Sequence, residues 1–118
     1  MSFVFSNDTP IYLQIIEDIK IKIMRKQYKA NDRLPSVRDL SMQYEVNPNT
    51  IQKALMELED MGLIYTERTN GKYVTTDTTI IDSLTKSSVN TLIDDFYNTM
   101  RSMGLSKQDI INIIKSKE

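Results

Sequence analysis

LPSVRDL at residues 34–40, VNPNTIQKALMELEDMGLI at residues 46–64 and RTNGKYV at residues 68–74 form an ordered series of local structure signals. The first two segments begin with residues that cap helices, and only a few residues separate one expected helix from the next. The third contains Asn70-Gly71, the commonest tight-turn dipeptide between strands. The series predicts two helices, joined by a short turn and followed by a β-hairpin.

Both helices have clear start signals. Ser36 and Asp39 have the spacing of a capping box, in which each side chain bonds the other residue's free amide. Asn47 is a strong N-cap, and Pro48 suits the first helical position. The first helix should end near Tyr44, so the two helices must cross steeply as a helix-turn-helix. Its inward-facing residues are expected to be Val37, Leu40 and Tyr44.

The second helix divides by face. The apolar stripe comprises Ile51, Ala54, Leu55, Leu58 and Met61, and the other face carries Asn49, Gln52, Lys53 and Met56. Its acids, Glu57, Glu59 and Asp60, all lie in the C-terminal half. The N-terminal half presents free amides and the positive end of the helix dipole, which suits entry into a DNA major groove. Asn and Gln side chains can bind adenine bidentately, which favours A·T pairs at the positions read by Asn49 and Gln52.

Each of these features also has an ordinary structural explanation. A polar stripe alone is more typical of an ordinary amphipathic helix in a small helical core. A run of basic residues along a chain, such as the one between Lys20 and Arg38, usually forms a solvated helix face. The predicted strands, residues 63–66 and 73–76, would alone suggest a surface hairpin. Arg68 and Lys72 flank the hairpin turn, where they can reach phosphates or the minor groove. The capped helix pair beside such a hairpin favours DNA binding.

Another helix should precede this series. Thr9-Pro10 is a plausible start, with Thr9 as the cap, and the helix should end near Gln27. Its apolar stripe comprises Ile11, Ile15, Ile16, Ile19, Ile23 and Met24. Residues 28–33 are predicted to be a loop in which Asn31 accepts a positive φ. The window from Lys20 to Arg38 has seven basic residues against a lone Asp32, so positive charge is concentrated before and within the helix-turn-helix.

Composition limits the other possibilities. With 118 residues, 40% of them hydrophobic, the chain can build one compact core and a small appendage. The absence of Cys and His removes thiol nucleophiles, disulfides, imidazole catalysis and the usual zinc sites. Asp94-Asp95 is a poor catalytic pair because neighbours on a helix point to different sides. We therefore expect no enzyme activity and no cofactor. Without a signal peptide or membrane span, the protein is expected to be soluble and cytoplasmic.

The spaced motifs resemble the GntR family of winged helix-turn-helix transcription regulators. The likeness rests on residues 10–15 (PIYLQI), residues 34–40, the pattern from Val46 to Ile64 and Gly71-x-x-Val74. The short remainder of the chain is most similar to the YtrA-like subfamily, which carries a small helical dimerisation appendage and often regulates transporter operons. Lys26, Ala30 and Asn31 stand where the family usually has Gly, Pro and Gly, and Thr69 replaces a common glycine in the wing.

The resemblance implies which residues contact DNA. Together with the charge pattern, it predicts a DNA-binding set of Arg38, Asn47, Asn49, Thr50, Gln52, Lys53, Arg68, Asn70, Gly71 and Lys72. The helix over residues 48–61 would read the operator, and the wing over residues 65–75 would lie beside it. The fold class is therefore mainly α with a small β-hairpin (α+β), with a DNA-binding domain over residues 1–76.

Residues 77–118 are predicted to form a two-helix dimerisation tail after a polar linker at residues 75–79. Ser106 and Asp109 form a second capping box, and the helix that follows is rich in isoleucine. The residues expected to pair with another chain are Leu84, Leu92, Ile93, Phe96, Met100, Ile110, Ile111 and Ile114. A twofold dimer would bind a palindromic operator with half-sites ~34 Å apart or slightly more. The alternative is that the tail folds back on its own winged helix.

Two other functions remain open at this point. A winged helix can serve as a protein–protein interaction module without touching DNA. A small-molecule effector could also bind at the dimer interface, near Tyr97, Met100 and Met103, although such a stripe is more often core. The favoured prediction is a dimeric repressor of an operon, for example a transporter operon.

Overall fold

The computed structural model describes residues 3–68 and 70–117. Its elements are α1 (Ile11–Met24), α2 (Val37–Tyr44), α3 (Pro48–Asp60), β1 (Ile64–Glu67), β2 (Gly71–Val74), α4 (Thr78–Ser102) and α5 (Lys107–Ser116). The chain divides into two compact units, Met1–Asp82 and Ser83–Glu118. The predicted α+β class with a winged helix-turn-helix is confirmed.

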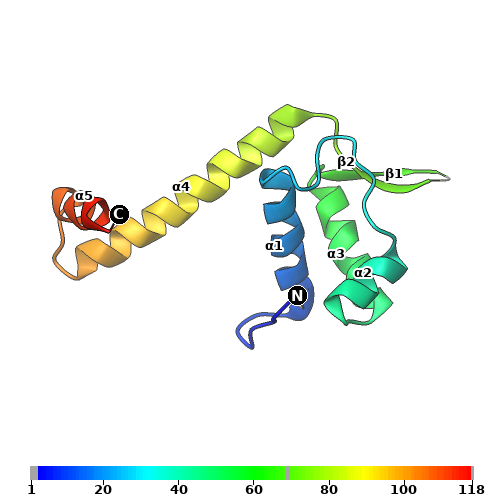
Figure 1. Ribbon diagram of the computed structural model, residues 1–118, viewed down its shortest axis with the longest axis horizontal. Coiled ribbons are helices and arrows are strands. Elements are labelled where there is room, and N and C mark those ends of the chain that lie inside the picture. Colours follow the sequence, from blue (N-terminus) through cyan, green and yellow to red (C-terminus); the bar gives the residue numbers. More distant parts are fainter. Residues whose placement is uncertain (1–2, 69, 118) are drawn as a thin grey trace. The chain divides into compact units, whose positions relative to one another are not determined.

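The first unit is built around α1 and α3, which lie side by side, with α2 near one end of α3 and the hairpin near the other (Figure 1). Its core consists of fully buried apolar side chains from every element, among them Ile15, Ile19, Leu40, Ile51, Leu55, Leu58, Leu63 and Val74. Burial of each such side chain contributes roughly 1.5–3 kcal/mol to folding. This packing holds the exposed face of α3 in a fixed position.

The cap predictions were mostly correct. The Ser36 hydroxyl accepts a hydrogen bond from the Asp39 amide, which is one of the two bonds of the predicted box. The Asn47 side chain accepts one from the Asn49 amide, and Ser106 and Asp109 form the full reciprocal box. The Thr9 cap was wrong, because Pro10 occupies the N-cap position of α1 without a side-chain bond. The helix also ends at Met24, before the predicted Gln27.

Three residues assigned to apolar stripes are less buried than expected. Ile11 and Met61 are 45% and 44% exposed, because they lie at the first residue of α1 and the C-cap of α3, where few neighbours cover them. Val37, the first residue of α2, is only half-buried. The interior positions of these stripes are buried as predicted.

The hairpin turn was also misplaced. Glu67 pairs with Gly71, so residues 68–70 connect the strands and Gly71 opens β2 instead of lying in a two-residue turn. Its φ of +101° lies in a region that L side chains rarely adopt. The other edge of β2 pairs with the loop before α2, through bonds from the Leu34 amide to the Lys72 carbonyl and from the Val74 amide to the Asp32 carbonyl, both 2.8 Å. The wing is thereby tied to the start of the helix-turn-helix.

The loop between α1 and α2 takes two left-handed residues. Asn31 has the predicted positive φ, at 67°, and Lys26 adopts 63°. Both stand at positions where the resemblance implied glycine. The chain therefore keeps a glycine-like backbone at two residues that carry side chains.

The second unit contains most of α4 and all of α5. α4 begins at Thr78, inside the predicted linker, and is 25 residues long, so the linker was predicted to extend too far. Asp77 explains the early start, because its carboxylate accepts a hydrogen bond of 3.0 Å from the Thr79 amide. Ile81, near the start of α4, is 8% exposed and belongs to the first unit.

Candidate nucleic-acid interface

The N-terminal half of α3 presents a continuous polar face. Asn47, Asn49, Gln52 and Lys53 are exposed, and Thr50 is half-buried. The Asn47 Oδ1 atom is engaged by the Asn49 amide at 2.8 Å, which leaves the Asn47 carboxamide nitrogen as a donor toward solvent. No acid lies in the first turn of α3. This end of the helix suits a nucleic-acid backbone and base edges.

Lys53 is held by an aromatic contact that the sequence did not reveal. Its Nζ atom lies 3.9 Å from the centroid of the Tyr12 ring on α1, a short cation–π distance. Tyr12 was part of the quoted PIYLQI motif but had no assigned role. The ring restricts the lysine near the exposed face of α3 while its charge remains available.

A groove of about 510 Å³ lies between α3, α2 and the hairpin. Its lining residues include Gln52, Met56, Val37, Thr66 and Lys72. Arg38 is the exposed residue directly after Val37. Of the predicted DNA-binding set, Gln52 of α3 and Lys72 of the wing therefore line one groove. Glu59 and Asp60 also line the groove, so its C-terminal side is acidic.

At the tip of the wing, Arg68, Asn70 and Gly71 are exposed, and Thr69 lies outside the described residues. A β-carbon on Gly71 would lie 3.5 Å from the Arg33 guanidinium. Arg33 also pairs with Tyr73 through a β-bridge. Arg33 belongs to the basic window, and its place beside the wing was not predicted because the pairing joins segments far apart in the chain.

Lys72 is engaged within the protein. Its Nζ atom lies 2.9 Å from Oε1 of Glu59 and 2.8 Å from the Thr66 hydroxyl. The hydrogen bond from Lys72 lowers the pKa of the Glu59 carboxyl below its ordinary value. The predicted set thus contains one cation that already has an acidic partner.

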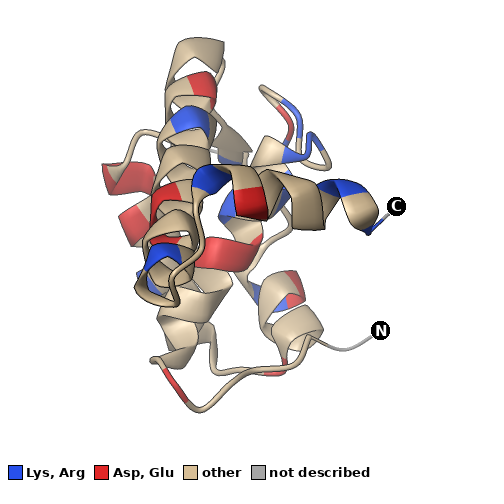
Figure 2. Ribbon diagram, turned by 90° about the vertical axis from the view of Figure 1, so that its left-hand side faces the viewer, with Lys and Arg blue, Asp and Glu red and all other residues tan. Residues whose placement is uncertain are grey.

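The basic window is less positive in the folded protein than along the chain. Lys20 pairs with Glu17 at 3.0 Å, and Lys22 pairs with Asp18 at 3.2 Å. Tyr44 donates a hydrogen bond of 2.6 Å to Asp18. Burial raises the pKa of the Tyr44 hydroxyl, and the hydrogen bond to Asp18 raises it further. Charges of both signs are spread over the ribbon in Figure 2. Interpreting Lys20 and Lys22 as free positive charge was therefore incorrect, because both acids lie just before the counted window.

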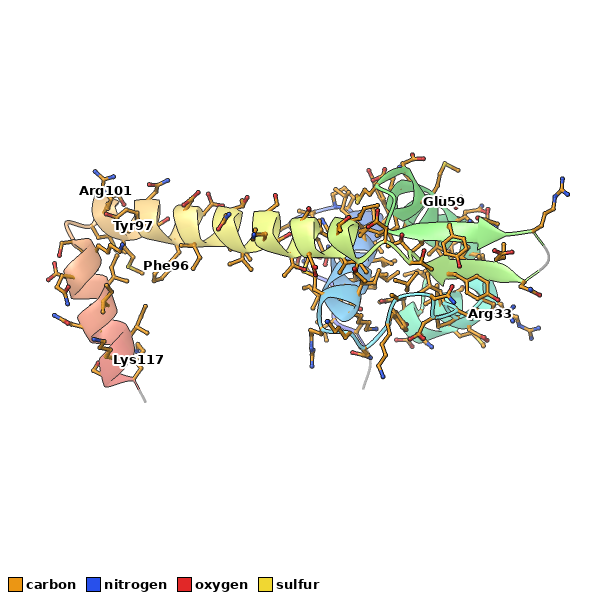
Figure 3. The ribbon with its side chains drawn as sticks, turned by 90° about the horizontal axis from the view of Figure 1, so that it is seen from above. Arg33, Glu59, Phe96, Tyr97, Arg101 and Lys117 are labelled. Atoms are coloured by element: carbon orange, nitrogen blue, oxygen red, sulfur yellow. The ribbon has the colours of Figure 1, made fainter. Side chains whose placement is uncertain are left out.

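In the tail, many predicted dimerisation residues remain uncovered. Leu92 is 69% exposed, Ile93 58%, Phe96 42% and Ile114 57%. Leu84, Met100 and Ile111 are half-buried, and Ile110 is buried. Phe96 and Tyr97 lie toward the end of α4 that leads to α5 (Figure 3) and line an apolar groove of about 300 Å³ with Ile93, Ile110, Ile111 and Ile114.

Only one of the three residues suggested for an effector site, Tyr97, lines the apolar groove between α4 and α5. Met100 and Met103 are not in its lining, and Met103 is 61% exposed. The Arg101 guanidinium lies 5.6 Å from the Tyr97 ring centroid. The suggested effector site lies at a dimer interface, so its placement stays a prediction.

Within residues 3–68 and 70–117, no group of three His, Cys, Asp or Glu side chains is placed to hold a metal ion. None of the helices in these ranges combines the length and apolar character needed to cross a membrane.

Three packed helices, an exposed polar face on the third and a two-stranded wing define a winged helix-turn-helix protein. The family model for bacterial regulatory proteins of the gntR family matches residues 11–74, so the chain belongs to the GntR family of DNA-binding transcriptional regulators. It is 39% identical to the transcriptional repressor YtrA of Bacillus subtilis over 94 residues, 75% of this chain and 72% of YtrA.

Solved structures agree with this assignment. A GntR family transcriptional regulator from Listeria monocytogenes is 41% identical, with a TM-score of 0.92 over 97% of this chain and all of that one. The DNA-binding domain of AraR in complex with operator ORX1 is 27% identical, with a TM-score of 0.58 over 61% of this chain and 93% of that one.

Proposed function

We propose that the protein is a dimeric transcriptional repressor that binds a palindromic operator. The N-terminal half of α3 enters the major groove, with Asn49 and Gln52 toward base edges. Arg38, Lys53 and the wing residue Arg68 contact the backbone. The exposed, acid-free polar face at the start of α3 is the observation that carries this proposal.

The proposed dimer is formed by the tail. A single copy offers few base contacts, and its exposed apolar tail residues form a surface of the kind that marks protein interfaces. Pairing through Leu92, Ile93, Phe96 and Ile114 would place two α3 helices on half-sites related by twofold symmetry. The name of the YtrA relative, a transcriptional repressor, supports repression as the outcome. We propose that the target is an operon in the cytoplasm, such as a transporter operon.

The test begins with selection of bound DNA from random fragments, followed by titration of the selected fragment at several salt concentrations. Specific binding should weaken steeply with salt, by a slope of about −0.9 for each phosphate neutralised. Gln52→Ala should cost ~1–3 kcal/mol and relax specificity at one base pair, and Arg38→Ala should reduce the slope by about 1. Gln108→Ala and Arg101→Ala are matched controls in the tail.

Two results would contradict the proposal. If no sequence is enriched while a protein partner binds the α3 face, the chain is an interaction module. If both Gln52→Ala and Arg38→Ala keep wild-type affinity with the dimer intact, the site assignment is wrong. Analytical ultracentrifugation establishes the oligomeric state of each variant.

A further inference from the structure

Glu59 on α3 and the cross-strand pair Thr66 and Lys72 form a closed triangle of hydrogen bonds, here named the wing latch. The Thr66 hydroxyl donates to Glu59 Oε1 at 2.9 Å, and the Lys72 ammonium donates to the same oxygen at 2.9 Å and to Thr66 at 2.8 Å. Thr66 and Lys72 lie directly opposite each other in the hairpin. One carboxylate therefore holds both strands of the wing.

The latch lies at the end of the proposed reading face. Asn49, Gln52, Met56 and Glu59 follow one another at spacings of three, four and three residues, so they share one side of α3. The groove beside them is lined by Gln52, Met56 and Glu59. A free carboxylate at this place would repel a phosphate that lies between α3 and the wing.

Lys72 offsets that charge. Its side chain is 30% exposed and that of Glu59 is 39% exposed, so the pair lies at the surface where DNA would approach. An ammonium has three donors, and two of them are used inside the latch. Direct binding of a phosphate by Lys72 would compete with Glu59 for the same charge.

We propose that Lys72 is a positioning residue and not a phosphate ligand: it holds the wing against α3 and neutralises Glu59 at the edge of the DNA site. This inference rests on the proposed function, since it assigns a role within the same interface. It also changes one member of the predicted DNA-binding set, while Arg68 at the tip of the wing keeps its role.

A double-mutant cycle on the selected DNA fragment tests the proposal. Lys72→Met should weaken binding ~10-fold, because Glu59 is left unneutralised, with little change in the salt slope. Adding Glu59→Gln should restore affinity to within ~3-fold of the wild type, because the repulsive charge is gone. Lys86→Met on α4 and Glu57→Gln on α3 are controls for loss of a charge elsewhere.

A phosphate ligand would behave differently. Loss of such a contact lowers the salt slope by about 1, and Glu59→Gln cannot restore it. That pair of results would overturn the proposal.

Amide hydrogen exchange in the absence of DNA separates this proposal from the function itself. Lys72→Met should speed exchange of the Tyr65 and Tyr73 amides, which belong to directly paired residues of the two strands, at least several-fold relative to the Ile51 and Leu55 amides in α3. Unchanged exchange across the hairpin would refute the holding role. If the wild type selects no DNA but Lys72→Met still speeds exchange of the hairpin amides, the proposed function fails while the holding role of the wing latch is supported.

Discussion

The two units of this chain use their apolar residues in opposite ways. In the first, Ile15, Leu40 and Leu58 are completely buried, whereas in the second Leu92, Ile93 and Ile114 are more than half exposed. The first unit therefore has its own core, and the second leaves an apolar face uncovered. The difference indicates that stability is local to the winged helix. In the proposed dimer, a second copy would cover the apolar face of the tail.

The largest expected effect comes from the core of the first unit. Leu58→Ala should destabilise it by about 2–5 kcal/mol, because the side chain is fully buried and its removal leaves a cavity. Urea denaturation followed by circular dichroism measures the change. Met56→Ala, at a site that is 63% exposed on the same helix, is the control and should cost far less. Similar losses for both variants would show that the first unit is not self-contained.

Charges on the exposed face of the tail should affect assembly and leave the winged helix intact. Leu92→Asp combined with Ile114→Asp should convert a dimer to monomers and weaken operator binding by at least ~10-fold, through loss of the second half-site. Analytical ultracentrifugation and DNA titration measure the two effects. Asn98→Asp with Asn112→Asp adds the same charge at exposed polar sites and should change neither. A dimer that survives the first pair would disprove the proposed interface.

The helix caps allow a finer comparison, because both units use the same local device. Asn47→Ala removes the α3 cap and should cost ~1 kcal/mol of folding stability, whereas Asn47→Ser should keep most of it. Ser106→Ala breaks the α5 capping box. It should lower dimer affinity and have little effect on the melting temperature of the first unit. Thermal melts and dilution experiments distinguish these outcomes. An equal effect of both Ala variants on the first unit would mean that the units fold together.

The smallest expected effect concerns Tyr12. Tyr12→Leu removes the ring beneath Lys53 and should weaken operator binding by a factor of about 2–5, corresponding to ~0.5–1 kcal/mol for a cation–π contact at an exposed site. Tyr12→Phe keeps the ring and is the matched control. In a Lys53→Met background, Tyr12→Leu should have no further effect on binding. A persistent loss in that background would show that Tyr12 acts through packing instead.

Much of the fold was predictable because its signals are local. Caps such as Asn47 and Ser106, and stripes such as Ile51 with Leu55, depend on residues within one or two turns of each other. The hairpin was found, but its turn was misplaced, since Asn70-Gly71 also fits a connection in which Gly71 opens the second strand. The long α4 was underestimated because its polar middle hid its continuity.

The candidate site was predictable only in outline. The exposed face with Asn49 and Gln52 followed from helical spacing, which the sequence alone determined. The neutralisation of Lys72 by Glu59, the support of Lys53 by Tyr12 and the placement of Arg33 beside Gly71 were decided by the tertiary structure. Each joins residues from different elements, and such contacts form only after packing brings those elements together. The sequence thus determined which residues face solvent on α3, and the folded chain decided which charges remain free to bind DNA.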